Sequence, residues 1–191
     1  IFHTTQDTIP RDIPYLKAPS ELVVSWGRRL AGYSGPRIGV VWAGNPGSGY
    51  DQKRSCHARD FLPLFQLEAF NWFSLQKGEA EQQLNDLAGA EKVVPLGREI
   101  SDFADTAAII QNLDLVISVE TAVPHLAGAL GKPVWTMLSF LPAWRWMLDR
   151  ADSPWYPTMR LFRQSEPGVW HDVVAQIAAS LGEIHGTHPK S

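Results

Sequence analysis

From residue 37 onward, short apolar runs alternate with segments in which apolar residues recur at helical spacing. The apolar runs, which predict strands, cover residues 37–42, 71–75, 92–95, 114–119, 133–137 and 159–162. The segments between and after them predict helices over residues 58–65, 79–88, 101–112, 122–130, 144–148 and 168–181. Such alternation is typical of a parallel sheet with helices on both faces. The pattern therefore predicts an α/β domain with about six strands.

The first 36 residues follow a different pattern, in which proline separates short polar stretches. One amphipathic stretch, residues 21–30, places Leu22, Val23, Trp26 and Leu30 at helical spacing. We interpret residues 1–36 as a connector with one short helix, ahead of a domain over residues 37–191.

Composition narrows the class of protein. The chain has 191 residues, 45% of them apolar, and a net charge of -3 without long runs of one sign, so we expect no nucleic-acid partner. No stretch of eighteen apolar residues occurs, which predicts no membrane span. Cys56 is the single cysteine, which favours the cytoplasm, and no Cys/His spacing indicates a metal. The first residue is Ile1 rather than Met, so we expect part of a longer protein.

In doubly wound parallel sheets, which have a Rossmann-like arrangement, ligands bind at the carboxyl ends of the strands. The strongest signal there is the run VETAVPHLAGALGKP, in which a strand ends at Val119 and a helix begins. A diphosphate would suit the open N–H groups of that helix, with Thr121 as donor or N-cap and His125 one turn later. Thr121 could also be only a cap and His125 a packing residue. Glu120 could bind sugar hydroxyls or only favour the helix dipole.

A glycine-rich loop, residues 43–55, follows the first predicted strand. Its glycines would let the backbone approach a ligand, and Lys53 or Arg54 could neutralise phosphate. The loop contains neither the GxxxxGK[ST] nor the GxGxxG spacing, which argues against a P-loop protein and against a dinucleotide-dependent oxidoreductase. A solvated turn with two surface cations remains the alternative.

Weaker candidates follow the second and third strands. Gln76 and Lys77 could reach a ribose or a phosphate, although an exposed lysine near a helix start is as common. Leu96 and Gly97 offer open backbone groups for a base. We interpret Asp102 and Asp105 as structural, because carboxylates stabilise the first turn of a helix. The aromatic residues at 142–146 and 155–157 belong more often to a core than to a sugar site.

Several strings together resemble a known family: RIGVVWAGNP, DQKRS, FSLQKG, DFADTAAIIQNLDLVISVETAVPHLAGALGKPVW and WRWMLDRADSPWYPTMRLFRQ. They are similar to the C-terminal domain of bacterial tetratricopeptide-repeat proteins with a glycosyltransferase module. This module is similar to the ADP-heptose heptosyltransferases of family 9 and, more distantly, to O-GlcNAc transferase. The resemblance covers about residues 14–181. It implies the C-terminal, donor-binding half of a GT-B glycosyltransferase.

The resemblance also implies a role for each matching residue. It implies a nucleoside-diphosphate sugar as donor substrate and no separate cofactor. The pyrophosphate would be lined by Gly44 and Asn45, with Lys53 or Arg54 as its cation; Gln76 or Lys77 would lie near the ribose, Leu96 and Gly97 near the base, and Thr121, Ala122 and His125 at the phosphates.

The implied reaction is inverting glycosyl transfer, in which Arg54 and His125 would stabilise the departing diphosphate. Relatives usually carry Asp where this chain has Glu120, which would bear on the donor sugar. The general base and the site for the acceptor glycan or protein are expected in an N-terminal domain outside this chain.

Two other functions fit the same residues. One is a non-catalytic nucleotide-binding or scaffold module of a repeat protein. The other is a GT-B-like epimerase that acts on a nucleotide sugar. Absence of binding to nucleoside diphosphates would favour the scaffold. Release of free nucleotide without a transfer product would favour the epimerase.

Overall fold

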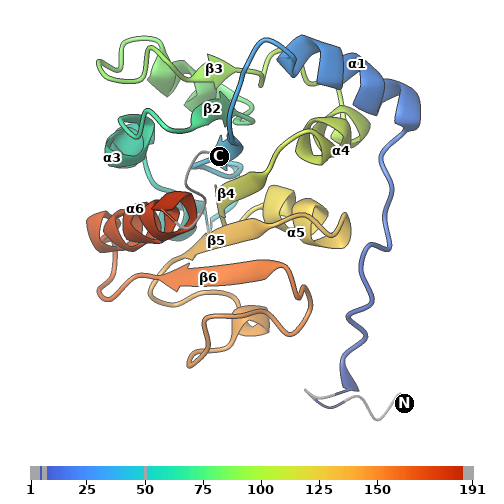
Figure 1. Cartoon of the computed structure of the whole chain (residues 1–191). Helices are drawn as coiled ribbons and strands as arrows, with labels where there is room; N and C mark the ends of the chain where they lie inside the picture. Colours follow the sequence, from blue (N-terminus) through green and yellow to red (C-terminus); the bar gives the residue numbers. More distant parts are fainter. Residues whose placement is uncertain (1–4, 6–7, 50, 187–191) are drawn as a thin grey trace.

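A computed structural model describes residues 5, 8–49 and 51–186 of the chain. Its centre is a six-stranded, wholly parallel sheet with the strand order β3-β2-β1-β4-β5-β6 (Figure 1). The strands are β1 (Arg37–Val41), β2 (Asn71–Ser74), β3 (Val94–Pro95), β4 (Leu115–Val119), β5 (Val134–Leu138) and β6 (Met159–Arg163). Each of them overlaps a run that the sequence predicted as a strand. The Rossmann-like α/β prediction is therefore confirmed.

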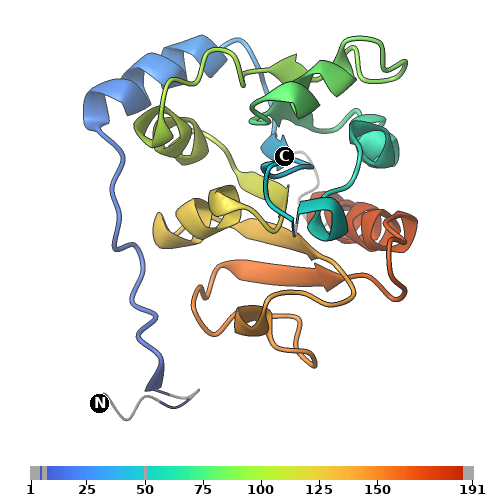
Figure 2. The same ribbon diagram turned by 180° about the vertical axis from the view of Figure 1, so that it is seen from behind.

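Helices cover both faces of the sheet (Figures 1 and 2). One face carries α1 (Ser20–Leu30), α4 (Phe103–Gln111) and α5 (Ala122–Ala129); the other carries α3 (Leu62–Phe65) and the long α6 (His171–Gly186). Short helical segments complete the fold: α2 (Asp51–Arg54), η2 (Ala58–Phe61), η3 (Glu79–Leu84) and η4 (Trp144–Trp146).

Two hydrophobic cores, one on each face, hold these layers together. Because side chains of a strand alternate between faces, Val116 of β4 packs toward α1, α4 and α5, whereas Ile117 and Val119 pack toward α3 and α6. All three are at most 1% exposed. Strands buried on both faces account for the continuous apolar runs in the sequence.

Two predicted helices are shorter in the structure. Residues 79–88 form a 3-10 helix only to Leu84, and Ala58 N–H donates to the Gln83 side chain, so this connection is tied to η2. The helix predicted at 144–148 ends after Trp146, because Met147 has a φ of 54° and leaves the right-handed helical region.

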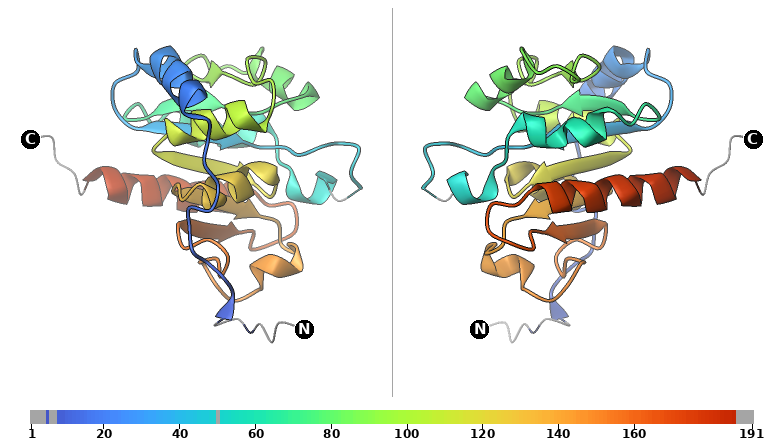
Figure 3. Two further views of the ribbon diagram at one scale, coloured as in Figure 1. Left: turned by 90° about the vertical axis from the view of Figure 1, so that its right-hand side faces the viewer. Right: turned by 90° about the vertical axis from the view of Figure 1, so that its left-hand side faces the viewer.

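The N-terminal segment packs on the domain. In α1, Leu30 is fully buried, and the Trp26 indole donates to Asp105 Oδ1 over 3.0 Å. Before α1 the chain runs in extended form past α5 (Figure 3), and the N–H groups of Tyr15 and Leu16 both donate to Ala129 O. That residues 1–36 form a connector separate from the domain stays a prediction. In the structure, α1 contributes to the core on the α1, α4 and α5 face.

The sheet order locates the crevice where a ligand would bind. Chain order runs from β1 toward β3 in one direction and from β4 toward β6 in the other, so it reverses between the neighbours β1 and β4. Loops that leave these two strands diverge there, which opens a crevice at their carboxyl ends. In the part of the chain that the structure describes, no helix is long and apolar enough to cross a membrane.

Candidate functional site

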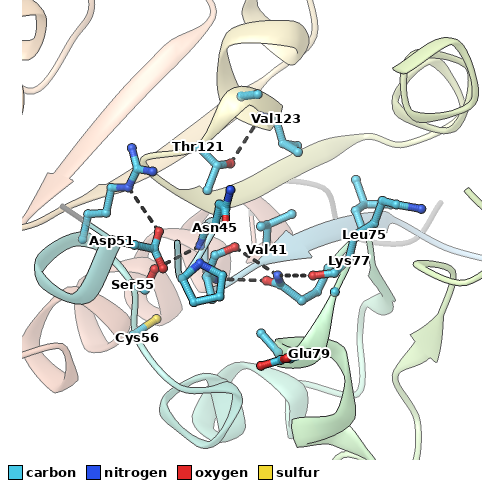
Figure 4. Close-up of a pocket in the computed structure, with 18 of the residues that line it drawn as sticks. Val41, Asn45, Asp51, Ser55, Cys56, Leu75, Lys77, Glu79, Thr121 and Val123 are labelled. Atoms are coloured by element: carbon cyan, nitrogen blue, oxygen red, sulfur yellow. Dashed lines mark hydrogen bonds and ion pairs between the residues drawn. The ribbon is translucent and has the colours of Figure 1, made fainter. Parts of the chain in front are cut away.

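A cavity of about 950 Å³ lies at this reversal, at the carboxyl ends of β1, β2 and β4 (Figure 4). Its walls come from the glycine-rich loop after β1, the segment after β2, the start of α4 and the start of α5. Volumes between about 300 and 1,000 Å³ are usual for small-molecule sites. The cavity is therefore large enough for a nucleotide-sized ligand.

The structure brings seven of the predicted site residues to this cavity: Gly44, Asn45, Arg54, Gln76, Lys77, Thr121 and Ala122. Five others do not line it: Lys53, Leu96, Gly97, Glu120 and His125. Among the described residues, the charged side chains of the lining are Asp51, Arg54, Lys77 and Glu79, two of each sign. Attraction for an anion would therefore depend on local geometry rather than on an excess of positive charge.

The N-terminus of α5 faces the cavity through Thr121, Ala122 and Val123. Thr121 is the N-cap, and its Oγ1 accepts the Val123 N–H over 3.3 Å. Pro124 has no N–H group. The first turn of α5, as far as the structure describes its partners, thus leaves the N–H of Ala122 to meet a ligand.

In the glycine-rich loop, α2 places an acid and a base on the same wall. Arg54 Nε lies 3.3 Å from Asp51 Oδ1, and the Asp51 side chain is 7% exposed against 28% for Arg54. The N–H of Gly44 donates to Ser55 Oγ over 3.0 Å. A Cβ on Gly44 would lie 2.1 Å from Asp51 Oδ1, so a side chain at this position would displace the Asp51 carboxylate. Tyr50 of this loop lies outside the described residues.

The side chain of Gln76 mainly stabilises the fold through hydrogen bonds to backbone groups. Its amide is 2% exposed, accepts the N–H groups of Trp42 and Ala43, and donates to the carbonyls of Ala43 and Lys77. These bonds connect the end of β1 to the segment after β2. Gln76 therefore shapes the cavity with its polar atoms already paired.

The ammonium group of Lys77 also has protein partners. It donates to the backbone carbonyls of Gly97, over 3.2 Å, and Ile100. A phosphate or ribose would have to compete with these two carbonyls for the same donors.

Leu96 and Gly97, which were predicted near the base, serve the packing of the fold instead of lining the cavity. Leu96 is fully buried in the core. A Cβ on Gly97 would lie 1.9 Å from the carbonyl oxygen of Gln76, so glycine allows two backbones to meet there. Lys53 is exposed on α2.

Glu120, directly after β4, and His125, in α5, contact the loop that follows β5. Glu120 is 5% exposed, and its carboxylate accepts Arg145 Nη1 over 3.1 Å and the Ala143 N–H over 3.4 Å. His125 stacks on Trp146, with ring centroids 5.0 Å apart. Burial, and then the positive charge of Arg145, lower the pKa of His125, which favours the neutral ring.

Sequence reasoning missed several residues of the cavity, and Phe103 is the most informative of them. It is the first residue of α4 and 62% exposed, yet it lines the cavity. An aromatic residue between Asp102 and Ala104, at the start of a helix after a strand, is the signal that could have identified it. The structural interpretation of Asp102 is confirmed, because its side chain caps α4 through the N–H groups of Ala104 and Asp105.

Cys56 also lines the cavity but is no candidate nucleophile. Burial, and next the negative charge of Asp60, raise the pKa of its thiol well above the ordinary value. The thiol donates a hydrogen bond to the backbone carbonyl oxygen of Trp42 over 3.5 Å. Thiolate is the reactive form of cysteine, so this environment favours an inert side chain.

No protein-family model matches the chain. Among curated proteins it is similar to Protein FlbA of Caulobacter vibrioides, with 27% identity over 185 residues that cover 94% of this chain and 31% of the relative. Among solved structures it is similar to E. coli ADP-heptose lps heptosyltransferase II, with a TM-score of 0.58, 15% identity and coverage of 93% of this chain and 56% of that one.

Two further structures share the fold. A glycosyl transferase family 9 protein of Veillonella parvula matches with a TM-score of 0.57, 10% identity and coverage of 92% and 47%. The E. coli heptosyltransferase WaaC with ADP-2-deoxy-2-fluoro heptose matches with a TM-score of 0.54, 15% identity and coverage of 95% and 52%. At such identities the likeness shows a glycosyltransferase-type fold. The chain spans about half of each of these structures and about a third of the Caulobacter protein.

Proposed function

We propose that this chain binds a nucleoside-diphosphate sugar and forms the donor-binding half of an inverting GT-B glycosyltransferase. The observation that carries the proposal is the cavity at the reversal of strand order, with Arg54 on one wall and the N-terminus of α5 on another. The shared fold supports it, because two of the similar structures are named as heptosyltransferases and one of these holds an ADP-sugar analogue.

The diphosphate would lie between α2 and α5. Arg54 would offer a guanidinium fork to phosphate oxygens, and the α5 terminus would add the Ala122 N–H, the Thr121 hydroxyl and the positive end of the helix dipole. Asn45, on the same wall, adds an amide. These donors suit an anion that is held locally, as the balanced charge of the lining requires.

The base would lie toward α4, where Phe103 presents an exposed aromatic ring to the cavity. Every base has a π-face, so stacking on Phe103 would contribute affinity without selecting one base. Gln76 and Lys77 would then support this part of the cavity through the backbone groups that they hold.

In the proposed reaction, an acceptor hydroxyl displaces the diphosphate from the anomeric carbon, with inversion. Negative charge grows on the leaving group, and donors already in place stabilise it most in the transition state. Arg54 and the α5 terminus would do this here. The acceptor and the general base would come from a further domain of a longer protein, in keeping with the share of the similar structures that this chain spans.

Calorimetry tests the binding step. We expect the chain to bind ADP, GDP or UDP, and Arg54→Ala to weaken that binding by about 10- to 100-fold, the range for a hydrogen bond to a charged group. Lys53→Ala, on the same turn but outside the cavity lining, is the matched control and should bind as the wild type does. Absence of binding to all three nucleotides would refute the proposal.

A non-catalytic nucleotide-binding module is the second candidate. It is favoured by the ion pairs Asp51–Arg54 and Glu120–Arg145, because each charged group already has a partner. Nucleotide binding without sugar transfer by the complete protein would support this candidate.

A further inference from the structure

His125 lies in a chain of side-chain contacts that reaches the N-terminal segment. Its Nδ1 lies 3.2 Å from Tyr156 Oη, and the hydroxyl of Tyr15 donates to that same Tyr156 oxygen over 3.4 Å. Of these three residues, His125 belongs to α5, Tyr156 to the loop before β6, and Tyr15 to the extended segment before α1. Tyr15 and Tyr156, which are 141 positions apart, are thus joined in a chain of contacts that ends at His125.

Tyr156 is held in place from two sides. Its ring packs so closely on α5 that a Cβ added to Gly128 would lie 2.4 Å from Tyr156 Cγ. Its backbone N–H donates to Ser153 Oγ over 3.3 Å. The residue is 9% exposed, so its hydroxyl has few positions available and meets His125 in a fixed geometry.

Tyr15 is placed by its backbone. The N–H groups of Tyr15 and Leu16 both donate to Ala129 O, at 3.0 and 3.2 Å. Pro14 lies close to Gly131, where an added Cβ would be 3.6 Å from the proline ring. The segment therefore follows the end of α5, the helix that carries His125.

The order of donors favours a proton on Nε2 of His125. Tyr156 accepts from Tyr15, and its own hydroxyl hydrogen can then be donated to Nδ1. A neutral imidazole that accepts at Nδ1 has its hydrogen on Nε2. Burial raises the pKa of Tyr156, so the phenol stays protonated and keeps this hydrogen. In the described part of the chain, Nε2 has no hydrogen-bond partner.

We propose that Tyr156, supported by Tyr15, is a positioning residue that holds His125 as the neutral Nε2–H tautomer, a hydrogen-bond donor for an anionic ligand. This inference rests on the proposed function, in which the ligand is a diphosphate at the start of α5. His125 does not line the cavity itself, but it follows the lining residue Thr121 by one helical turn, on the same face of α5. It adds that the segment before α1 takes part in the site through a hydroxyl group.

The surroundings of His125 favour the neutral ring. Trp146 covers one face at 5.0 Å, and Tyr156 meets it edge to face at 5.7 Å. The charged groups that act on it are Arg145, which lowers the pKa of His125, and Glu120, which raises it. These two are paired with each other at 3.1 Å, so their effects on the ring partly cancel.

Long-range ¹H–¹⁵N spectra of the labelled chain, recorded above the titration range of histidine, report the tautomer directly. The chain has six histidines, and the His125→Gln variant identifies the signals of His125. We expect a protonated Nε2 and an unprotonated Nδ1. In Tyr156→Phe, which keeps the ring that packs on Gly128, both signals should shift toward the Nδ1–H form, and in Tyr15→Phe they should shift less in the same direction.

Tyr33→Phe is the control, because Tyr33 packs on Phe73 at 5.0 Å and should leave the spectrum of His125 unchanged. An Nδ1–H tautomer in the wild type, or an unaltered tautomer in Tyr156→Phe, would overturn the inference. A shift as large in Tyr33→Phe as in Tyr156→Phe would overturn it as well.

Calorimetry with ADP, GDP and UDP tests the role of the donor. Tyr156→Phe should weaken binding by about 2- to 10-fold, the range for one hydrogen bond. A changed tautomer with unchanged affinity would refute the role toward the diphosphate. Failure of the wild type to bind any of these nucleotides would instead refute the proposed function, so the two failures are distinguishable.

Discussion

The carboxylate of Asp51 lies between Gly44 and Arg54: Oδ1 is 3.3 Å from Arg54 Nε and occupies the space that a side chain at position 44 would need. A buried acid therefore holds the cation that we assign to the diphosphate. Phosphate oxygens that approach Arg54 would meet this negative charge as well as the guanidinium group.

Asp51→Asn should therefore strengthen the binding of ADP, GDP or UDP, by about fivefold, equivalent to about 1 kcal/mol. Asparagine has the same shape, so the contact with Gly44 is kept while the repulsion is removed. Calorimetry measures the change, and Asp86→Asn, outside the cavity lining, is the control. Weaker binding would mean that Asp51 mainly orients Arg54.

The Phe103→Ala variant should distinguish the contribution of the base to binding from that of the phosphates. Stacking of a base on an aromatic ring contributes about 1–3 kcal/mol, so we expect ADP to bind about 5- to 100-fold more weakly. Binding of inorganic pyrophosphate should not change. Because Phe103 is 62% exposed, thermal stability should be close to that of the wild type. Equal losses for both ligands would place the base elsewhere.

Gly128→Ala should destabilise the fold. The new methyl group would lie 2.4 Å from Tyr156 Cγ, and overpacking of this kind costs about 1–3 kcal/mol. Gly182→Ala is the matched control on α6: no heavy atom lies within 4 Å of the added Cβ, and alanine should stabilise that helix by up to about 1 kcal/mol. Urea unfolding compares the two variants, and similar free energies of unfolding would argue against tight packing of Tyr156 on α5.

His125 should make the domain sensitive to mild acid. Burial, and then Arg145, lower its pKa in the folded state below the ordinary value of 6.5, so the unfolded chain binds a proton first as the pH falls. The contribution of His125 to the free energy of unfolding should then be constant above this value and decrease as the pH falls from 6.5 through the folded pKa. In His125→Gln this decrease should be smaller. Urea titrations at several pH values measure it, and equal slopes for the two proteins would contradict the prediction.

The positions of the six strands along the chain followed from the sequence, because strands buried on both faces must be continuous apolar runs whatever they pack against. The structural role of Asp102 at the start of α4 could also be predicted from the sequence. A cap acts within one turn of its own helix, so its partners are close in sequence. Local rules of this kind also anticipated Thr121 as the N-cap of α5.

The contacts of individual side chains could not be predicted from the sequence by such local rules. Gln76 and Lys77 follow a strand as ligand-binding residues do, yet their partners Ala43 and Gly97 lie 33 and 20 residues away. Phe103 was missed because its ring lines a cavity whose other walls are remote in sequence.

By itself, the sequence determined the parallel sheet, its helical layers and the edge at which a ligand would bind. These depend on hydrophobic periodicity, glycine, proline and caps, which act over a few residues. Tertiary structure alone decided that Arg54 is paired with Asp51, that Glu120 is paired with Arg145, and that His125 meets Tyr156 and Tyr15. The strength of a charge or a hydrogen bond depends on distance and burial, and both exist only once the chain has folded.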